Sequence, residues 1–157
     1  MPKNQRICSI KLDDHVRVRL SPTIEHERRV AIHDLLEDNS FSPIGEFEGP
    51  FQVHLTMQEG RLIFNVHDEA DEPLVSFALP LADFRSLIKD YFVVCGSYFD
   101  AIKTLSPSRI EAIDMGRRAL HNEGSKLLQE RLADRVSLDI DTARRLFTLL
   151  CVLHIRP

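Results

Sequence analysis

Residues 51–79, FQVHLTMQEGRLIFNVHDEADEPLVSFAL, decide the fold of this chain. Apolar and polar residues alternate along them, which predicts half-buried strands over residues 51–58, 61–67 and 74–79. A two-residue turn at Glu59-Gly60 pairs 57 with 62, 55 with 64 and 53 with 66. The acidic turn that follows pairs 66 with 75, 64 with 77 and 62 with 79. Every apolar residue then shares one face of a three-stranded antiparallel meander.

Four further segments carry the apolar stripe of helices, and we expect them to cover one side of the meander. They are residues 22–38, 81–105, 107–132 and 142–155. Ser-Pro pairs open two of them, and Asp141 is a candidate cap for the last. Residues 81–105 predict a helix of roughly 35 Å that forms the centre of the core. Its expected packing seam is Phe84, Ile88, Tyr91, Cys95, Tyr98, Ile102 and Leu105.

The remaining segments complete an α+β domain. Residues 8–20 alternate on either side of Asp13-Asp14-His15, which predicts an N-terminal strand or hairpin. Residues 40–50 predict a loop that tucks Phe41, Ile44 and Phe47 onto the core, with a mobile lid as the alternative. Residues 136–140 predict a short link or edge strand. We expect a single globular domain over residues 1–157.

Composition narrows the functional classes. The net charge of −4 and the pI near 6.0 argue against general nucleic-acid binding, which needs phosphate neutralisation. Cys8, Cys95 and Cys151 lie far apart among apolar residues, which indicates buried thiols and a reducing compartment. Apolar runs stop far short of the roughly 20 residues that span a bilayer. The sequence therefore predicts a cytoplasmic protein with no membrane segment and no cofactor.

Residues 110–132, IEAIDMGRRALHNEGSKLLQERL, predict a helix with an unusual distribution of residues. Glycines 116 and 124 lie on its apolar face, where each lowers helix propensity by about 1 kcal/mol. This loss predicts close approach of a neighbouring helix, either residues 81–105 or the final one. The whole expected packing face is Ile113, Gly116, Leu120, Gly124, Leu127 and Leu128.

A second arc of this helix, separate from the packing face, is polar and forms the first candidate site. It carries Asp114, Arg118, His121 and Ser125 at helical spacing, with Asn122 beside them. Such groups can bind a phosphate or carboxylate, or place a general acid or base beside a cation. The structural interpretation is a solvated face, with an Asp114–Arg118 pair worth about 0.3–0.5 kcal/mol.

Arg117 lies at the edge of the packing face, where burial without a partner costs several kcal/mol. We expect a carboxylate from another element, such as Asp100 or an acid of the first helix, or a bound anion. A stem that reaches solvent is the alternative. The pairs Arg28-Arg29, Arg117-Arg118 and Arg144-Arg145 could jointly contact an acidic partner.

A second candidate row follows from the register of the meander. His54, Asn65 and Ser76 line up on the face opposite the apolar residues, and His67 lies on an adjacent row. An exposed polar row is also what the solvated face of such a sheet normally shows. We find no third ligand with metal-like spacing, so no metal site is predicted.

Three stretches of the chain together resemble a known family. They are residues 25–41, EHERRVAIHDLLEDNSF, residues 89–132, which run from KDYFVVCGSYFDAI through the polar helix, and residues 139–157, DIDTARRLFTLLCVLHIRP. They resemble the alphaproteobacterial uncharacterised protein family 0262. The resemblance implies a stand-alone bacterial cytosolic domain, and it carries over no activity, cofactor or catalytic residue.

Two functional hypotheses follow. The sequence lacks GxGxxG, Walker-type, HExxH, CxxC and GxSxG motifs, which favours a non-catalytic interaction or regulatory module. Its partner would be an unidentified protein, with a homo-oligomer as a further option. The alternative is a small-molecule enzyme or an anionic-ligand-binding protein that uses the polar arc of residues 107–132.

Overall fold

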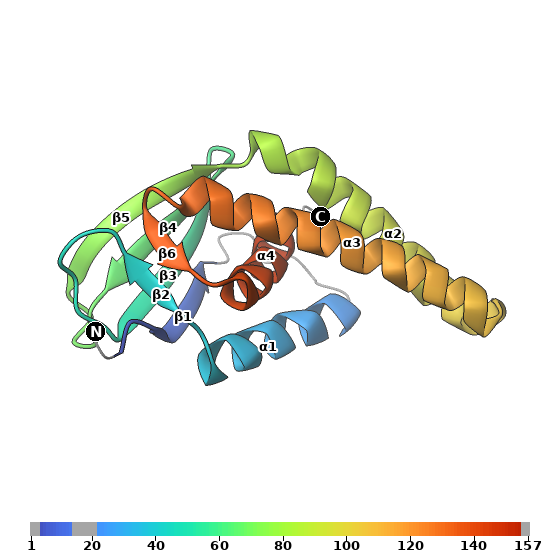
Figure 1. The fold of residues 1–157 in the computed structure, drawn as a ribbon, viewed down its shortest axis with the longest axis horizontal. Coiled ribbons are helices and arrows are strands. Elements are labelled where there is room, and N and C mark those ends of the chain that lie inside the picture. Colours follow the sequence, from blue (N-terminus) through green and yellow to red (C-terminus); the bar gives the residue numbers. More distant parts are fainter. Residues whose placement is uncertain (1–3, 14–21, 155–157) are drawn as a thin grey trace.

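The computed structural model describes residues 4–13 and 22–154. Its class is α+β, as the sequence predicts (Figure 1). In chain order the elements are β1 (Ile7–Asp13), α1 (Pro22–Glu37), β2 (Phe41–Pro43), β3 (Phe51–Gln58), β4 (Arg61–His67), β5 (Pro73–Pro80), a 3-10 turn (Ala82–Phe84), α2 (Arg85–Thr104), α3 (Pro107–Leu132), β6 (Val136–Leu138) and α4 (Ile140–His154). None of the described helices has a stretch long and apolar enough to cross a bilayer.

The meander of β3, β4 and β5 has the predicted register. Leu55 pairs with Phe64 and Phe64 with Phe77, and the flanking pairs are also as expected. Phe64 and Phe77 stack with ring centroids 5.0 Å apart. Period-two burial along β3 and β4 confirms that one face of the sheet is buried against the helices.

The sheet has a fourth strand, β1, whose pairing and orientation the sequence did not predict. This strand runs parallel to β3, with Ile7 opposite Phe51 and Leu12 opposite Leu55. A parallel neighbour requires a crossover, which α1 and β2 supply between the two strands. The second half of the predicted N-terminal hairpin, residues 14–20, lies outside the described residues.

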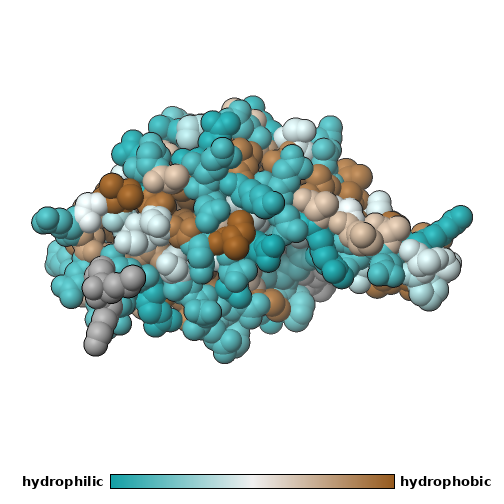
Figure 2. All heavy atoms as spheres, in the orientation of Figure 1, coloured by the Kyte–Doolittle hydropathy of each residue, from teal (hydrophilic) through white to brown (hydrophobic). Residues whose placement is uncertain are grey.

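Helices α2 and α3 form an antiparallel pair that projects beyond the sheet and the other helices (Figure 1). This geometry corrects the prediction that residues 81–105 form the centre of the core. The first half of that seam is buried, but Ile102 and Leu105 are 48% and 37% exposed, because the far half of α2 projects with α3 beyond the sheet and the other described helices. Figure 2 shows hydrophobic atoms along this extension, on a face that is otherwise mostly hydrophilic.

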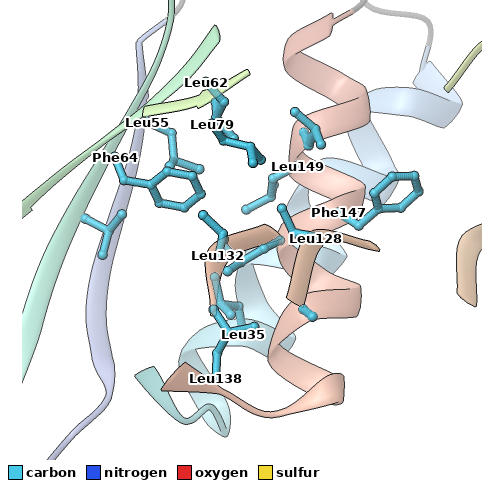
Figure 3. Close-up of a cluster of buried hydrophobic side chains, with 14 of the residues drawn as sticks. Leu35, Leu55, Leu62, Phe64, Leu79, Leu128, Leu132, Leu138, Phe147 and Leu149 are labelled. Atoms are coloured by element: carbon cyan, nitrogen blue, oxygen red, sulfur yellow. The ribbon is translucent and has the colours of Figure 1, made fainter. Parts of the chain in front are cut away.

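Helix α4 lies at the centre of the core instead. Its Phe147 and Leu149 are fully buried. Leu149 points toward the apolar side of the sheet, as do Leu128 and Leu132 of α3, whereas the Phe147 ring points away from the sheet (Figure 3). The helix begins two residues earlier than expected. Asp139, rather than the predicted Asp141, caps it by accepting a 2.9 Å hydrogen bond from the Thr142 amide.

The segment 40–50 is only partly a loop. Its first residues form β2, which pairs with β6 in a small antiparallel sheet. Phe41 is buried and Phe47 packs against the core, but Ile44 is 56% exposed, so the expectation for Ile44 is wrong. Cys95 and Cys151 are buried thiols as predicted, whereas Cys8 is half-buried.

The two glycines of α3 have different environments. Gly124 is covered by α4, where an added Cβ would collide with the fully buried ring of Phe147. Of the two neighbours that the sequence left open, the final helix is therefore the one that packs closely on Gly124. Gly116 was expected to make a similar contact, but a Cβ there would meet no described atom within 4 Å, because this part of α3 belongs to the projecting pair.

Candidate functional site

A pocket of about 550 Å³ lies between α1, α3 and α4, with a wall from α2. Arg117 and His121 both open into it, as do Arg118 and Asn122. The full lining is His26, Glu27, Val30, Ala31 and Asp34 of α1, Tyr91 of α2, Arg117, Arg118, His121 and Asn122 of α3, and Arg144, Arg145 and Thr148 of α4. The structure thus brings Arg117 to one concave surface with three of the five residues of the first candidate site, Arg118, His121 and Asn122.

Arg117 forms its ion pair with an acid of its own helix, Asp114, and not with Asp100. Glu27 of α1 lies near enough for the charge of Arg117 to act on its pKa, so the expected interaction with an acid of the first helix is electrostatic and not a hydrogen bond. Nε and Nη2 of Arg117 donate to Oδ1 of Asp114 at 3.0 and 2.7 Å, and the guanidinium lies over the Tyr98 ring, 5.4 Å from the centroid. Asp114 also accepts the predicted hydrogen bond from Arg118. The hydrogen bonds from these two arginines hold the pKa of Asp114 below its usual value. Side chains of a helix lean toward its N-terminus, which favours this i to i−3 contact over a longer reach.

His121 is fixed in the wall of the pocket. Its Nε2 lies 2.8 Å from Oγ1 of Thr148, and its ring packs between Tyr91 and Phe147. The Thr148 hydroxyl also lies 3.2 Å from the Arg144 carbonyl. In the tautomer with a proton on Nε2, the hydroxyl donates to this carbonyl and accepts from Nε2–H of His121. Burial, with help from the charges of Arg117 and Arg144, lowers the pKa of His121 to about 4. The imidazole is therefore neutral at pH 7.

Ser125 belongs to the core, not to the pocket surface. It is fully buried, and its hydroxyl donates to the His121 carbonyl at 2.6 Å. The helical wheel placed it correctly beside His121 but gave no sign that α4 would cover this turn. Its hydroxyl is bonded within its own helix, and its buried side chain contributes to the packing of the core.

The low pKa of His121 predicts how stability depends on pH. The unfolded chain takes up a proton below pH 6.5, whereas the folded protein does so only near pH 4. Stability is therefore lost as the pH falls through this window. Between pH 7 and pH 5 we expect the free energy of unfolding to fall by about 2 kcal/mol more in the parent protein than in His121→Gln. Urea unfolding at both pH values measures this difference, with the exposed His33→Gln as control. An equal pH dependence in parent and His121→Gln would show that His121 is not buried as described.

Several pocket residues were not candidates in the sequence. Arg144 and Arg145 appeared there only as one of three arginine pairs, and Glu27 only among the acids of the first helix. Burial raises the pKa of Glu27, and the nearby charge of Arg117 opposes this rise. Helical spacing identifies neighbours on one helix, whereas these residues reach the pocket through the packing of α1 and α4 on α3.

The second candidate row has the predicted alignment. His54 lies opposite Asn65 and Asn65 opposite Ser76, whose hydroxyl donates to Oδ1 of Asn65 at 2.9 Å. The His54 and His67 rings stack with centroids 4.5 Å apart. Asp71, which the spacing argument did not include, lies beside both rings because the turn after β4 folds back over the sheet.

Fold and pocket together define a small α+β protein with an arginine-lined cavity between three helices. The chain belongs to the uncharacterised protein family UPF0262, whose family model matches residues 4–156. It is similar to a UPF0262 protein of Paramagnetospirillum magneticum, with 56% identity over 156 residues that cover 99% of each chain. A relative from Azorhizobium caulinodans is 54% identical over 155 residues, covering 98% of this chain and 96% of its own. No solved structure matches the chain.

Proposed function

We propose that the protein is a non-catalytic binding module for an anionic small molecule, which occupies the pocket between α1, α3 and α4. One observation carries the proposal. Arg117 and Arg118 of α3 and Arg144 and Arg145 of α4, distant in sequence, line the same cavity. Guanidinium groups bind carboxylate and phosphate with parallel N–H donors, which makes them well suited to such a ligand.

The arginines retain hydrogen-bonding capacity for a ligand. Arg144 contacts Asp141 only at 3.5 Å, and Arg145 donates to the Asp38 carbonyl at 3.2 Å. Each guanidinium has five N–H donors, so these contacts leave donors over. The lining itself has two carboxyl groups, Glu27 and Asp34, against four arginines, and Asp114 outside the lining pairs with Arg117 and Arg118. Since burial also favours the neutral form of Glu27, the local charge favours an anion.

The pocket also has an apolar wall. Val30, Ala31 and Tyr91 form part of its lining, and its volume of about 550 Å³ lies within the usual range for small-molecule sites. A ligand that joins an anionic group to a flat apolar portion fits both surfaces.

The state of His121 supports binding rather than catalysis. A general base needs a free acceptor nitrogen and a pKa near the working pH. With the proton on Nε2, the acceptor nitrogen of His121 is Nδ1, which lies 3.5 Å from the buried hydroxyl of Ser125, and the pKa of about 4 makes it a weak base at neutral pH. The imidazole therefore supports the wall of the pocket.

Thermal unfolding with simple probes tests this proposal. Phenyl phosphate, benzoate and inorganic phosphate are added at constant ionic strength, and we expect phenyl phosphate to raise the Tm most. At 100 times its Kd a ligand stabilises the folded state by about 2.7 kcal/mol. Arg117→Gln should abolish the increase, although Asp114 keeps its bond from Arg118.

The matched control is Arg109→Gln, which removes the same charge from an exposed position of α3 away from the pocket lining. It should respond to phenyl phosphate as the parent does. The proposal fails if the parent shows no saturable increase in Tm, or if Arg109→Gln and Arg117→Gln lose it equally.

A further inference from the structure

We propose that His54, His67 and Asp71 form a binding site for a divalent metal ion of the zinc type. The site lies on the face of the sheet opposite the core and does not share residues with the arginine pocket. His54 comes from β3, His67 ends β4, and Asp71 belongs to the turn before β5. The proposal corrects the sequence-based expectation that this row has no third ligand.

The spacing of the three ligand atoms suits one small ion. Oδ1 of Asp71 lies 3.0 Å from Nδ1 of His67 and 3.5 Å from Nε2 of His54. All three atoms lie within 4.8 Å of one another. Tetrahedral zinc bonds nitrogen and oxygen at about 2.0–2.1 Å, which separates its ligand atoms by roughly 3.3 Å. The two measured distances lie on either side of that value.

An unsatisfied nitrogen gives independent support. Nε2 of His54 is buried and makes no hydrogen bond within the described part of the chain, although the Asp71 carboxylate lies 3.5 Å from it. Buried polar atoms without a partner are rare in folded proteins and call for an explanation such as an ion. A metal ion bound by the lone pair of Nε2 supplies the missing interaction.

The turn between β4 and β5 holds Asp71 in place. Oδ1 of Asp68 accepts hydrogen bonds from the amides of Ala70 and Glu72, both at 2.9 Å, so Asp68 is used to form the turn. Asp71 adopts a left-handed backbone conformation with φ of 63°, and its carboxylate faces the two histidines. The carboxylate also supplies the negative charge that a divalent cation requires.

The stacked rings define what must change when the ion binds. The planes of His54 and His67 differ by 19°, whereas an ion has to lie in the plane of each ring that ligates it. One imidazole must therefore turn about its side-chain bonds. A hollow of about 420 Å³ beside the rings provides the space, with Thr56 and Asn65 in its lining. Lys11 also lines it but is exposed, so its ammonium can turn to solvent.

The ligand types select the metal. Two imidazole nitrogens and one carboxylate favour Zn²⁺ over Mg²⁺ or Ca²⁺, which prefer oxygen ligands. The fourth position of a tetrahedral ion would be open to water or another small ligand from the hollow.

Calorimetric titration of the chelator-treated protein with Zn²⁺ tests the site. We expect one ion per chain, no comparable binding of Mg²⁺, and a visible absorption spectrum of the Co²⁺ form typical of four-coordinate geometry. Asp71→Asn and His54→Ala should each weaken Zn²⁺ binding by more than about 100-fold, which exceeds the usual effect of changing an outer-sphere residue. Cooperative unfolding in urea checks that each metal-free variant is folded. If Asp71→Asn or His54→Ala is not folded, His67→Asn takes its place.

His33→Ala is the matched control. His33, Asp34 and Glu37 form another group with metal-like spacing, on the exposed surface of α1. The substitution should leave Zn²⁺ binding unchanged. The proposal is overturned if the parent binds no Zn²⁺, if the three site variants bind it as the parent does, or if His33→Ala removes the binding.

Discussion

Replacing Gly124 by alanine is expected to lower the free energy of unfolding by about 2–3 kcal/mol, in the upper part of the usual range for overpacking a core. The added Cβ would collide with the Phe147 ring, since even the ring atom Cε2 would lie only 2.7 Å away. That ring is fully buried and contacts the rings of Tyr91 and His121, with centroids 6.2 and 5.3 Å away. It therefore has little room to move. Urea unfolding measures the loss.

The same substitution at Gly116 should have the opposite sign. A Cβ there meets no described atom within 4 Å, so alanine should stabilise α3 by about 0.5–1 kcal/mol through its higher helix propensity. Combining Gly124→Ala with Phe147→Leu should recover part of the stability lost in the single variant. If Gly124→Ala stabilised the protein as Gly116→Ala does, α4 would not pack on α3 at this point.

Replacing Asn39 by alanine is the second substitution with a large expected effect, about 2–4 kcal/mol of stability. Oδ1 of Asn39 accepts a 2.6 Å hydrogen bond from the Ile7 amide, and Nδ2 donates to the carbonyls of Ile7 and Leu35 at 2.9 and 2.7 Å. Ile7 and Leu35 are fully buried. Losing a partner leaves each buried group with a penalty of about 1–3 kcal/mol, which water relieves only in part.

Asn65→Ala is the control for this effect. Asn65 accepts one hydrogen bond from Ser76 on the solvated face of the sheet, so we expect a loss below about 1 kcal/mol. Urea unfolding compares the two variants under the same conditions. Equal losses would mean that Asn39 does not join α1 to β1 in the manner described.

The meander could be predicted closely because its apolar residues leave no other register. A shift of one residue would turn Phe64 and its neighbours to solvent, so the pairing of Leu55 with Phe64 and Phe77 follows from the pattern alone. The parallel partner of β1 could not be predicted in this way. Its pairing depends on a crossover and on Asn39, a single polar residue without a sequence signature.

Helical spacing predicted the candidate site in part. It identified Arg117, Arg118 and His121 on one helix, and the pairing of Asp114 with Arg118. It failed for Ser125 and for the partner of Arg117, because burial and side-chain reach depend on neighbouring helices and rotamers. Arg144 and Asp71 could not be placed from sequence either, since each reaches its cluster through tertiary packing or a turn.

Chemical-shift mapping with phenyl phosphate on the 15N-labelled protein tests most directly whether the arginine pocket binds an anion. We expect saturable shifts concentrated on the amides of α1, α3 and α4 around Arg117, His121 and Arg144, and we expect their loss in Arg117→Gln/Arg144→Gln. Shifts that map elsewhere, or that persist in the double variant, would contradict anion binding in this pocket.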